Sequence, residues 1–226
     1  MFHCRIRSRS NADRAVRLLR VLRTLAAETR RGRYAGAAIY RGPIEGQPTP
    51  FRTLVGCLIS QRARDEQTAK ICARLFAEAD SPETILRLSP ARLRAILYGS
   101  GFYRTKARHL RAICDRVVGT GVPRTRDALM ELPGIGPKCA NLVMARCFGA
   151  AHIAVDTHVH RISNRLGWVS TKTPEKTEPA LTVQVPVRWR KRVNALLVAH
   201  GQVVCKPIRP LCGECPVRTL CPKKGV

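Results

Sequence analysis

The sequence predicts an all-α protein, and two kinds of observation lead to that prediction. Apolar residues recur three and four positions apart in several segments, which is the period of an amphipathic helix, and no segment alternates as a half-buried strand does. Hydroxyl residues followed by proline stand where such segments begin, as at Ser81-Pro82, Ser89-Pro90 and Thr173-Pro174. An N-cap hydroxyl before a proline at the first helical position signals the start of a helix.

The expected helices of the first half surround one strongly apolar segment. A first amphipathic helix is expected over residues 11–29, followed by a connector over 31–50 that is rich in Gly, Arg and Pro. Residues 51–60 are apolar on nearly all sides, which predicts a buried central helix. The pattern breaks over 61–65, and a further helix follows through Phe76.

In the second half, a short glycine-rich stretch joins two helical segments. It reads Leu132-Pro133-Gly134-Ile135-Gly136-Pro137-Lys138. A loop is expected over 99–103, and helices are expected over 105–118, 125–131, 137–148, 156–166 and 187–199, with another that starts at Thr173.

Charge and composition restrict the partner and the compartment. The 226 residues carry 41 Lys and Arg against 15 Asp and Glu, a formal net charge of +26. This excess favours a polyanionic partner such as nucleic acid, with a merely highly charged surface as the alternative. No apolar run is long enough to span a membrane. Because residues 1–33 lack the apolar core of a secretory signal, a cytoplasmic location is expected, and an organelle transit peptide remains an alternative.

The hairpin Leu132–Lys138 has the composition of a small anion site. Gly134 and Gly136 are expected to take positive φ, and Pro137 suits the first position of the following helix. The free amides of such a turn and of a helix N-terminus favour a phosphate. Lys138 falls in the first turn, where the positive end of the helix dipole favours a neutral, nucleophilic amine. The alternative is an ordinary turn followed by a solvated lysine.

Four cysteines near the end of the chain have the spacing of a metal site. Cys205, Cys212, Cys215 and Cys221 fall in a proline-rich segment that cannot form a regular helix or a core of its own. A metal centre held by four thiolates supplies the missing stability. Zinc and a [4Fe–4S] cluster both remain open, and the unequal spacing favours the cluster. The other six cysteines, Cys4, Cys57, Cys72, Cys114, Cys139 and Cys147, are expected to be free thiols, mostly in the core.

Together these motifs resemble the helix-hairpin-helix DNA glycosylases of the endonuclease III type. The hairpin with Lys138, the stretch Val155-Asp156-Thr157-His158 and the four-cysteine pattern match that family in order and spacing over residues 49–221. The resemblance implies two helical domains with a DNA groove between them. One domain is expected over 40–151 and the other over 1–39 plus 152–226, with a [4Fe–4S] cluster in the loop 205–221.

The resemblance also implies a chemistry. Lys138 is expected to attack C1′ of a flipped nucleotide, to expel an oxidised pyrimidine and to form a Schiff base that cuts the strand 3′ to the abasic site by β-elimination. Asp156 is expected to stabilise positive charge on the sugar and to help Lys138 lose its proton. The simpler alternative for Asp156 is the N-cap of the helix that follows it.

Further residues are expected to contact DNA. Phe102 resembles a residue that the family inserts into the base stack, with a core aromatic as the alternative. Arg62 stands where the family usually has a gap-filling glutamine, and Gln61 precedes it, so the preferred opposite base is open. The expected DNA contacts are Gln61, Arg62, Phe102, Leu132, Gly134, Ile135, Gly136 and His158, with Lys206, Arg209 and Arg218 near the cysteines.

The expected partner is double-stranded DNA with a damaged base or an abasic site, bound by a monomer. Two alternatives remain open. Mismatch adenine glycosylases commonly lack the lysine and carry a further C-terminal domain, whereas this sequence keeps Lys138 and ends shortly after Cys221. A DNA-binding paralogue with weak or no activity is the other alternative.

Overall fold

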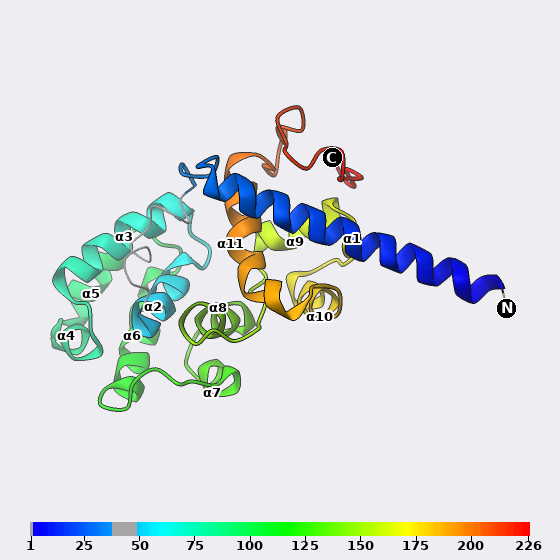
Figure 1. The fold of residues 1–226 in the computed structure, drawn as a ribbon. Helices are drawn as coiled ribbons and strands as arrows, with labels where there is room; N and C mark the ends of the chain where they lie inside the picture. Colours follow the sequence, from blue (N-terminus) through cyan, green and yellow to red (C-terminus); the bar gives the residue numbers. More distant parts are fainter. Residues whose placement is uncertain (1, 38–48) are drawn as a thin grey trace. The chain divides into compact units, whose positions relative to one another are not determined.

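The computed structural model describes residues 2–37 and 49–226, and the side chains of 13–37 and 49–226. Within these ranges every regular element is a helix (Figure 1), which confirms the all-α prediction. The chain divides into two compact units, Ala38–Ala154 and a discontinuous unit of Met1–Ala37 with Val155–Val226. Most of the expected connector over 31–50, and the expected domain boundary at 39/40, lie outside the described residues.

The unit Ala38–Ala154 is built around one buried helix. It contains α2 (Pro50–Ser60), α3 (Asp65–Glu78), α4 (Pro82–Arg87), α5 (Pro90–Leu97), α6 (Tyr103–Val117), α7 (Arg126–Met130) and α8 (Pro137–Cys147). Helix α2 packs against α3, α6 and α8, and its residues from Phe51 to Ile59 are all buried except Arg52. The prediction of a central helix from its apolar composition is therefore confirmed.

The start signals read from the sequence are N-caps in the structure. The hydroxyl of Ser81 accepts the amide of Thr84, and Ser89 does the same for Arg92. Thr173 caps the helix that begins at Pro174 in the same way. Each cap satisfies one of the amides that a helix start leaves unpaired, which fixes where these helices begin.

The second unit consists of four helices and a C-terminal loop. Its helices are α1 (Phe2–Arg30), α9 (Thr157–Arg165), α10 (Pro174–Gln184) and α11 (Val187–Val203). Helix α11 packs against α1 and α9. Helix α1 begins well before residue 11, where the apolar periodicity starts, so the predicted start was too late. No helix of the described residues is long and apolar enough to cross a bilayer.

One cysteine prediction is wrong. Cys57 of α2 and Cys139 of α8 are joined by a disulfide, with their Cα atoms 5.7 Å apart. The two residues lie on facing sides of helices that pack together. Because they are far apart in the sequence, this contact could not be predicted from it. Cys72 and Cys114 are buried free thiols as expected, and burial raises the pKa of each to about 12.

Candidate functional site

The hairpin is a tight turn between α7 and α8 that requires glycine at one of its two glycine positions. The amide of Ile135 donates to the carbonyl of Leu132 at 3.1 Å, which closes the turn. Gly134 has φ of 78°, and a Cβ there would collide with Nδ1 of His109 on α6. Gly134 is therefore needed both for its backbone conformation and for the close approach of His109.

The prediction of positive φ is wrong for Gly136. This residue has φ of −103° and ψ of −178°, which is extended backbone, and it is the N-cap of α8. An N-cap residue ordinarily takes such a conformation, because the helical dihedrals begin only at the next residue. A Cβ at Gly136 would meet nothing within 4 Å, so the fold itself does not require glycine here.

The backbone of the hairpin, rather than its apolar side chains, is available to a ligand. Leu132 and Ile135 belong to the hydrophobic core and are 4% and 5% exposed. Gly134 is exposed and Gly136 is half-buried. In the described part of the chain, no acceptor is found for the amides of these two glycines. Any contact from Leu132 or Ile135 to DNA must therefore come from their backbone.

Lys138 lies in the first turn of α8, where the end of α2 meets it. The side chain is half-buried, and Nζ donates a hydrogen bond to Oγ of Ser60 at 3.4 Å. The Ser60 hydroxyl in turn donates to the carbonyl of Cys57 at 2.8 Å. Next along the chain, Nε2 of Gln61 donates to the carbonyl of Gly134 at 2.7 Å. The loop after α2 is thus tied to the hairpin at Gly134 and at the lysine itself.

A second lysine also holds that loop, and no pattern in the sequence marks it. Lys106 of α6 is 4% exposed, and Nζ donates to the carbonyls of Ile59 at 2.7 Å and Gln61 at 2.6 Å. A cation at the C-terminus of α2 also complements the helix dipole. Burial lowers the pKa of Lys106 to about 8. A lowered pKa suits a nucleophile, but this amine is buried and hydrogen-bonded, so it positions the loop.

Arg62 and Phe102 form an exposed pair on neighbouring loops. Both residues have left-handed backbone, with φ of 50° and 58°. The guanidinium carbon of Arg62 lies 5.4 Å from the centroid of the Phe102 ring, a cation–π distance. A Cβ at Gly101 would lie 2.7 Å from the carbonyl oxygen of Arg62, so glycine permits the contact. Phe102 is 65% exposed, which excludes the alternative of a core aromatic.

Asp156 caps α9 in the discontinuous unit. Its Oδ1 accepts the amide of Val159 at 2.8 Å, so the capping role is confirmed. The side chain is half-buried. Oδ2 has no hydrogen-bond donor among the residues described, which leaves one carboxylate oxygen free for a ligand. Capping and catalysis are therefore compatible at this residue.

His158 is packed between α9 and α11. Its Nδ1 lies 3.2 Å from Nη2 of Arg161. On the facing helix, a Cβ at Gly201 would lie 2.6 Å from the same nitrogen. The ring is half-buried, so the close packing against Gly201 supports the packing alternative for this residue.

The four cysteines of the C-terminal segment line one small cavity. Cys205, Cys212, Cys215 and Cys221 are half-buried around a space of about 30 Å³ below the end of α11. Figure 1 shows the chain after α11 turning without a regular helix. Two arginines of α9 bind the start of this segment. Arg161 donates to the carbonyl of Cys205 at 2.8 Å. Arg165 donates to the carbonyls of Lys206 and Pro207 at 2.7 and 2.9 Å.

Two of these sulfurs receive hydrogen bonds that suit a thiolate, while burial raises the pKa of Cys215 and that of Cys221. Nη1 of Arg165 donates to Sγ of Cys205 at 3.4 Å, and the amide of Lys223 donates to Sγ of Cys221 at 3.4 Å. In iron–sulfur proteins, hydrogen bonds to the sulfurs and the local charge set the reduction potential of the cluster. Over the described residues, no three His, Cys, Asp or Glu side chains are placed to hold a single metal ion.

His200 and Tyr34 support the same cavity from α11 and from the turn after α1, and sequence reasoning missed both. His200 Nδ1 is hydrogen-bonded to the hydroxyl of Tyr34 at 3.1 Å, and Nε2 lies 3.8 Å from Sγ of Cys215. Burial lowers the pKa of His200 to about 4, so the ring is neutral at pH 7. No periodic pattern marks Tyr34, which lies in a short turn yet is fully buried.

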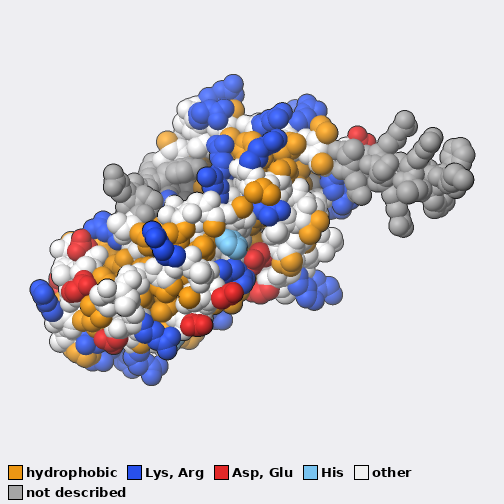
Figure 2. Space-filling model, turned by 60° about the horizontal axis from the view of Figure 1, so that its bottom comes forward, with side chains coloured by type: hydrophobic (Ala, Val, Ile, Leu, Met, Phe, Trp, Pro, Cys, Tyr) orange, Lys and Arg blue, Asp and Glu red, His pale blue; other side chains and the backbone are white. Residues whose placement is uncertain are grey.

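The predicted phosphate contacts near the cysteines are exposed. Lys206, Arg209 and Arg218 all have solvent-accessible side chains. Lysine and arginine side chains are spread over the face of the molecule drawn in Figure 2. The described surface is therefore strongly positive, as the net charge of +26 implies.

Comparison with known proteins identifies the family. Residues 55–186 match the HhH-GPD superfamily of base excision DNA repair proteins. Endonuclease III of Thermotoga maritima is 43% identical over 175 residues, which cover 76% of this chain and 82% of that protein. Endonuclease III of Rickettsia conorii is 35% identical over 174 residues, which cover 76% and 83%.

Solved structures agree with this relationship. A non-covalent endonuclease III–DNA complex is 33% identical, with a TM-score of 0.72 over 77% of this chain and 84% of that chain. A thermostable thymine-DNA glycosylase, 23% identical, has a TM-score of 0.78 over 95% and 97% and bears on the fold alone. The chain therefore belongs to the endonuclease III family of the HhH-GPD superfamily.

Proposed function

We propose that this chain, a DNA glycosylase and AP lyase by family, removes oxidised pyrimidines from duplex DNA with Lys138 as its nucleophile. The observation that carries the proposal is the position of the Lys138 amine. It lies in the first turn of α8, directly after a hairpin with two free amides, and the Ser60 hydroxyl accepts its hydrogen bond. An amine beside a phosphate-binding turn is placed to reach the sugar of a bound nucleotide.

The reaction proceeds through a covalent intermediate. The unprotonated Nζ of Lys138 attacks C1′ of the flipped nucleotide, and the glycosidic bond breaks with its electron pair leaving on the base. The nitrogen then loses a proton, and the sugar ring opens to a Schiff base. Removal of a C2′ proton breaks the bond to the 3′ oxygen, which leaves as the phosphate. Hydrolysis of the imine frees the lysine.

In this proposal, Asp156 acts on the same sugar that Lys138 attacks. One oxygen caps α9 through the amide of Val159, which fixes the orientation of the carboxylate. The other oxygen stabilises the positive charge that develops on the sugar and accepts the proton that Lys138 must lose. Because Lys138 and Asp156 belong to different units, catalysis requires both units to engage one nucleotide.

The two loops of the hairpin-containing unit are proposed to open the duplex. Phe102 is exposed and its backbone is left-handed, so its ring is free to enter the base stack. Arg62 stacks on the same ring and fills the gap that the flipped nucleotide leaves. A guanidinium pairs well with the O6 and N7 edge of guanine, which favours guanine opposite the lesion.

Cys205, Cys212, Cys215 and Cys221 are proposed to hold a [4Fe–4S] cluster. The four sulfurs line one cavity, and Arg165 and the Lys223 amide already donate to two of them. The cluster supplies structural stability to a loop that has no regular helix. Cys212→Ser should lose the visible absorbance and the iron and sulfide of the wild type, whereas zinc in a colourless wild type contradicts the assignment.

The proposed partner is double-stranded DNA, and the protein is proposed to bind it as a monomer in the cytoplasm. The test is a panel of duplexes that carry thymine glycol, dihydrouracil, uracil, an abasic site, or adenine opposite 8-oxoguanine, each incubated with borohydride. Base release and a covalent adduct with the oxidised pyrimidines support the proposal. Release of adenine without an adduct identifies a mismatch adenine glycosylase, and tight binding without release identifies a non-catalytic paralogue.

A further inference from the structure

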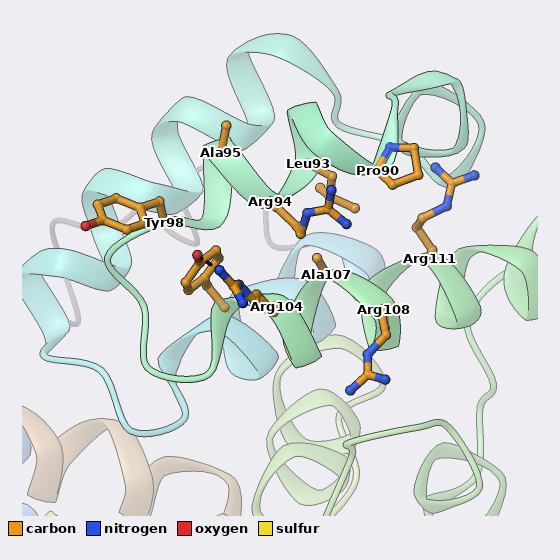
Figure 3. Close-up of a pocket in the computed structure, with 10 residues that line it drawn as sticks. Pro90, Leu93, Arg94, Ala95, Tyr98, Arg104, Ala107, Arg108 and Arg111 are labelled. Atoms are coloured by element: carbon orange, nitrogen blue, oxygen red, sulfur yellow. Dashed lines mark hydrogen bonds between the residues drawn. The ribbon is translucent and has the colours of Figure 1, made fainter.

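A basic groove lies between α5 and α6, outside the site described above. Its volume is about 900 Å³. Its apolar floor is formed by the exposed Pro90, Ala95 and Tyr98, whereas Leu93 and Ala107 are buried and offer almost no surface. Arginines from both helices rim it, with Arg94 from α5 and Arg104 and Arg108 from α6 (Figure 3). The groove thus joins an apolar floor to a positively charged edge.

The positive charge of this groove is not neutralised. No acidic residue lines it, and in the described part of the chain no ion pair involves Arg94, Arg104 or Arg108. Arg104 donates to the hydroxyl of Tyr103 and Arg108 to that of Thr105, both on the surface, whereas a fourth arginine, Arg111, donates to the carbonyls of Leu86 and Leu88. Three guanidiniums therefore remain for a negatively charged ligand.

The groove faces away from the hairpin. Lys106 and His109 are on the face of α6 that contacts the end of α2 and Gly134. Arg108 is two residues from Lys106, about 200° round a helix of 3.6 residues per turn, and Arg104 shares its face. If the hairpin and Phe102 hold the duplex, as the proposed function has it, the duplex lies against the other face of α6 and leaves the groove accessible.

We propose that the α5–α6 groove docks an acidic, amphipathic segment of a partner protein. Such a segment supplies carboxylates for the three guanidiniums and aliphatic side chains for the exposed Pro90 and Ala95. The exposed ring of Tyr98, held edge-on to Tyr103 at 5.4 Å, adds an amphipathic anchor at one end. A nucleic-acid strand matches the charge but leaves Pro90 and Ala95 without an aliphatic partner.

The test uses the full-length protein and a fluorescent helical peptide of glutamate and leucine, with leucines at helical spacing. Its control is a peptide of the same composition with the leucines scattered. Fluorescence anisotropy should show saturable binding of the first peptide and at least about tenfold weaker binding of the second. Duplex DNA bound beforehand should leave the peptide affinity unchanged.

Two variants locate the binding site. Arg104→Glu/Arg108→Glu should weaken the amphipathic peptide at least about tenfold, because two attractive charges become repulsive. The matched control Arg20→Glu/Arg23→Glu makes the same change of charge at exposed positions of α1 and should have little effect. Ala95→Trp fills the groove without altering charge and should also block the peptide, which keeps the test independent of electrostatics.

Three outcomes overturn the proposal. The peptide does not bind saturably, or both charge variants weaken it equally, which means non-specific attraction to a basic protein. The third is a loss of single-stranded or duplex DNA affinity in the groove variant but not in its control. That result assigns the groove to nucleic acid, and it leaves the proposed function of Lys138 untouched.

Discussion

The guanidinium of Arg62 lies over the ring of Phe102, 5.4 Å from its centroid, although forty positions separate the two residues in the sequence. Both residues have left-handed backbone on adjoining loops. Gly101 allows the loops to approach, since a Cβ there would collide with the carbonyl of Arg62. The pair presents one aromatic and one cationic group to solvent, which suits insertion into a base stack.

Phe102→Ala should slow release of a damaged base from duplex DNA by about ten- to a hundredfold, because stacking of one base on an aromatic ring contributes about 1–3 kcal/mol. Strand cleavage at a preformed abasic site in single-stranded DNA should stay within about threefold of wild type, since no stack has to be opened. Both rates are measured by gel assay. Equal losses on the two substrates contradict the role of Phe102 as a wedge.

The two hairpin glycines should respond differently to alanine. Gly134→Ala should destabilise the protein by roughly 2–3 kcal/mol, because it combines positive φ with a clash against His109. Gly136→Ala should change stability by less than about 1 kcal/mol but should weaken DNA binding, because a methyl group then stands beside the amide. Thermal unfolding and duplex affinity are the measurements. Equal destabilisation by both variants rules out this distinction.

Asp156→Asn separates capping from catalysis. Asparagine is as good an N-cap as aspartate, so the unfolding temperature should hardly change. Base release should fall about a hundredfold or more, because the amide neither accepts a proton nor carries the charge that the sugar needs. Single-turnover rates and thermal unfolding check the two parts. A variant as active as the wild type would show that Asp156 acts only as the N-cap of α9.

Lys106→Met should destabilise the fold by about 2 kcal/mol, because the carbonyls of Ile59 and Gln61 lose their buried donor. The effect should also depend on pH. Burial lowers the pKa of Lys106 to about 8 from 10.5, so between these values the unfolded state binds more protons than the folded state. The stability of the wild type therefore gains from this group as pH rises through that window.

The variant lacks this titrating group, so the stability gap between wild type and Lys106→Met should widen from pH 8 to pH 10.5. Below pH 8 the lysine is protonated in both states and the gap should be constant. Urea unfolding at several pH values measures it. A gap that is independent of pH across the whole range contradicts the assigned pKa.

The helices could be predicted from sequence because their signals are local. The apolar run 51–60 and the hydroxyl–proline starts at Ser81, Ser89 and Thr173 each act through neighbouring residues. The start of α1 could not, because residues before 11 carry no apolar period. Gly136 was expected to resemble Gly134, since a turn motif does not say which glycine has positive φ and which begins the helix.

The motifs of the site could be predicted from the sequence, but the residues that hold those motifs in position could not. Lys138, Asp156 and the four cysteines stand in recognisable patterns, whereas Lys106, His200 and the disulfide between Cys57 and Cys139 depend on contacts between distant segments. Lys106 falls on an amphipathic helix like any surface lysine, and only the fold turns it under the end of α2. Such long-range contacts have no periodic or local signature.

The most direct test of the account is to find which lysine carries the sugar. Borohydride reduction of the protein bound to a duplex with thymine glycol, followed by proteolysis and mass spectrometry, should place the adduct on Lys138. Lys138→Gln should form no adduct and cut no strand while its helical circular dichroism matches the wild type. An adduct on another lysine, Lys106 included, or strand cleavage by Lys138→Gln would contradict the assignment of the nucleophile.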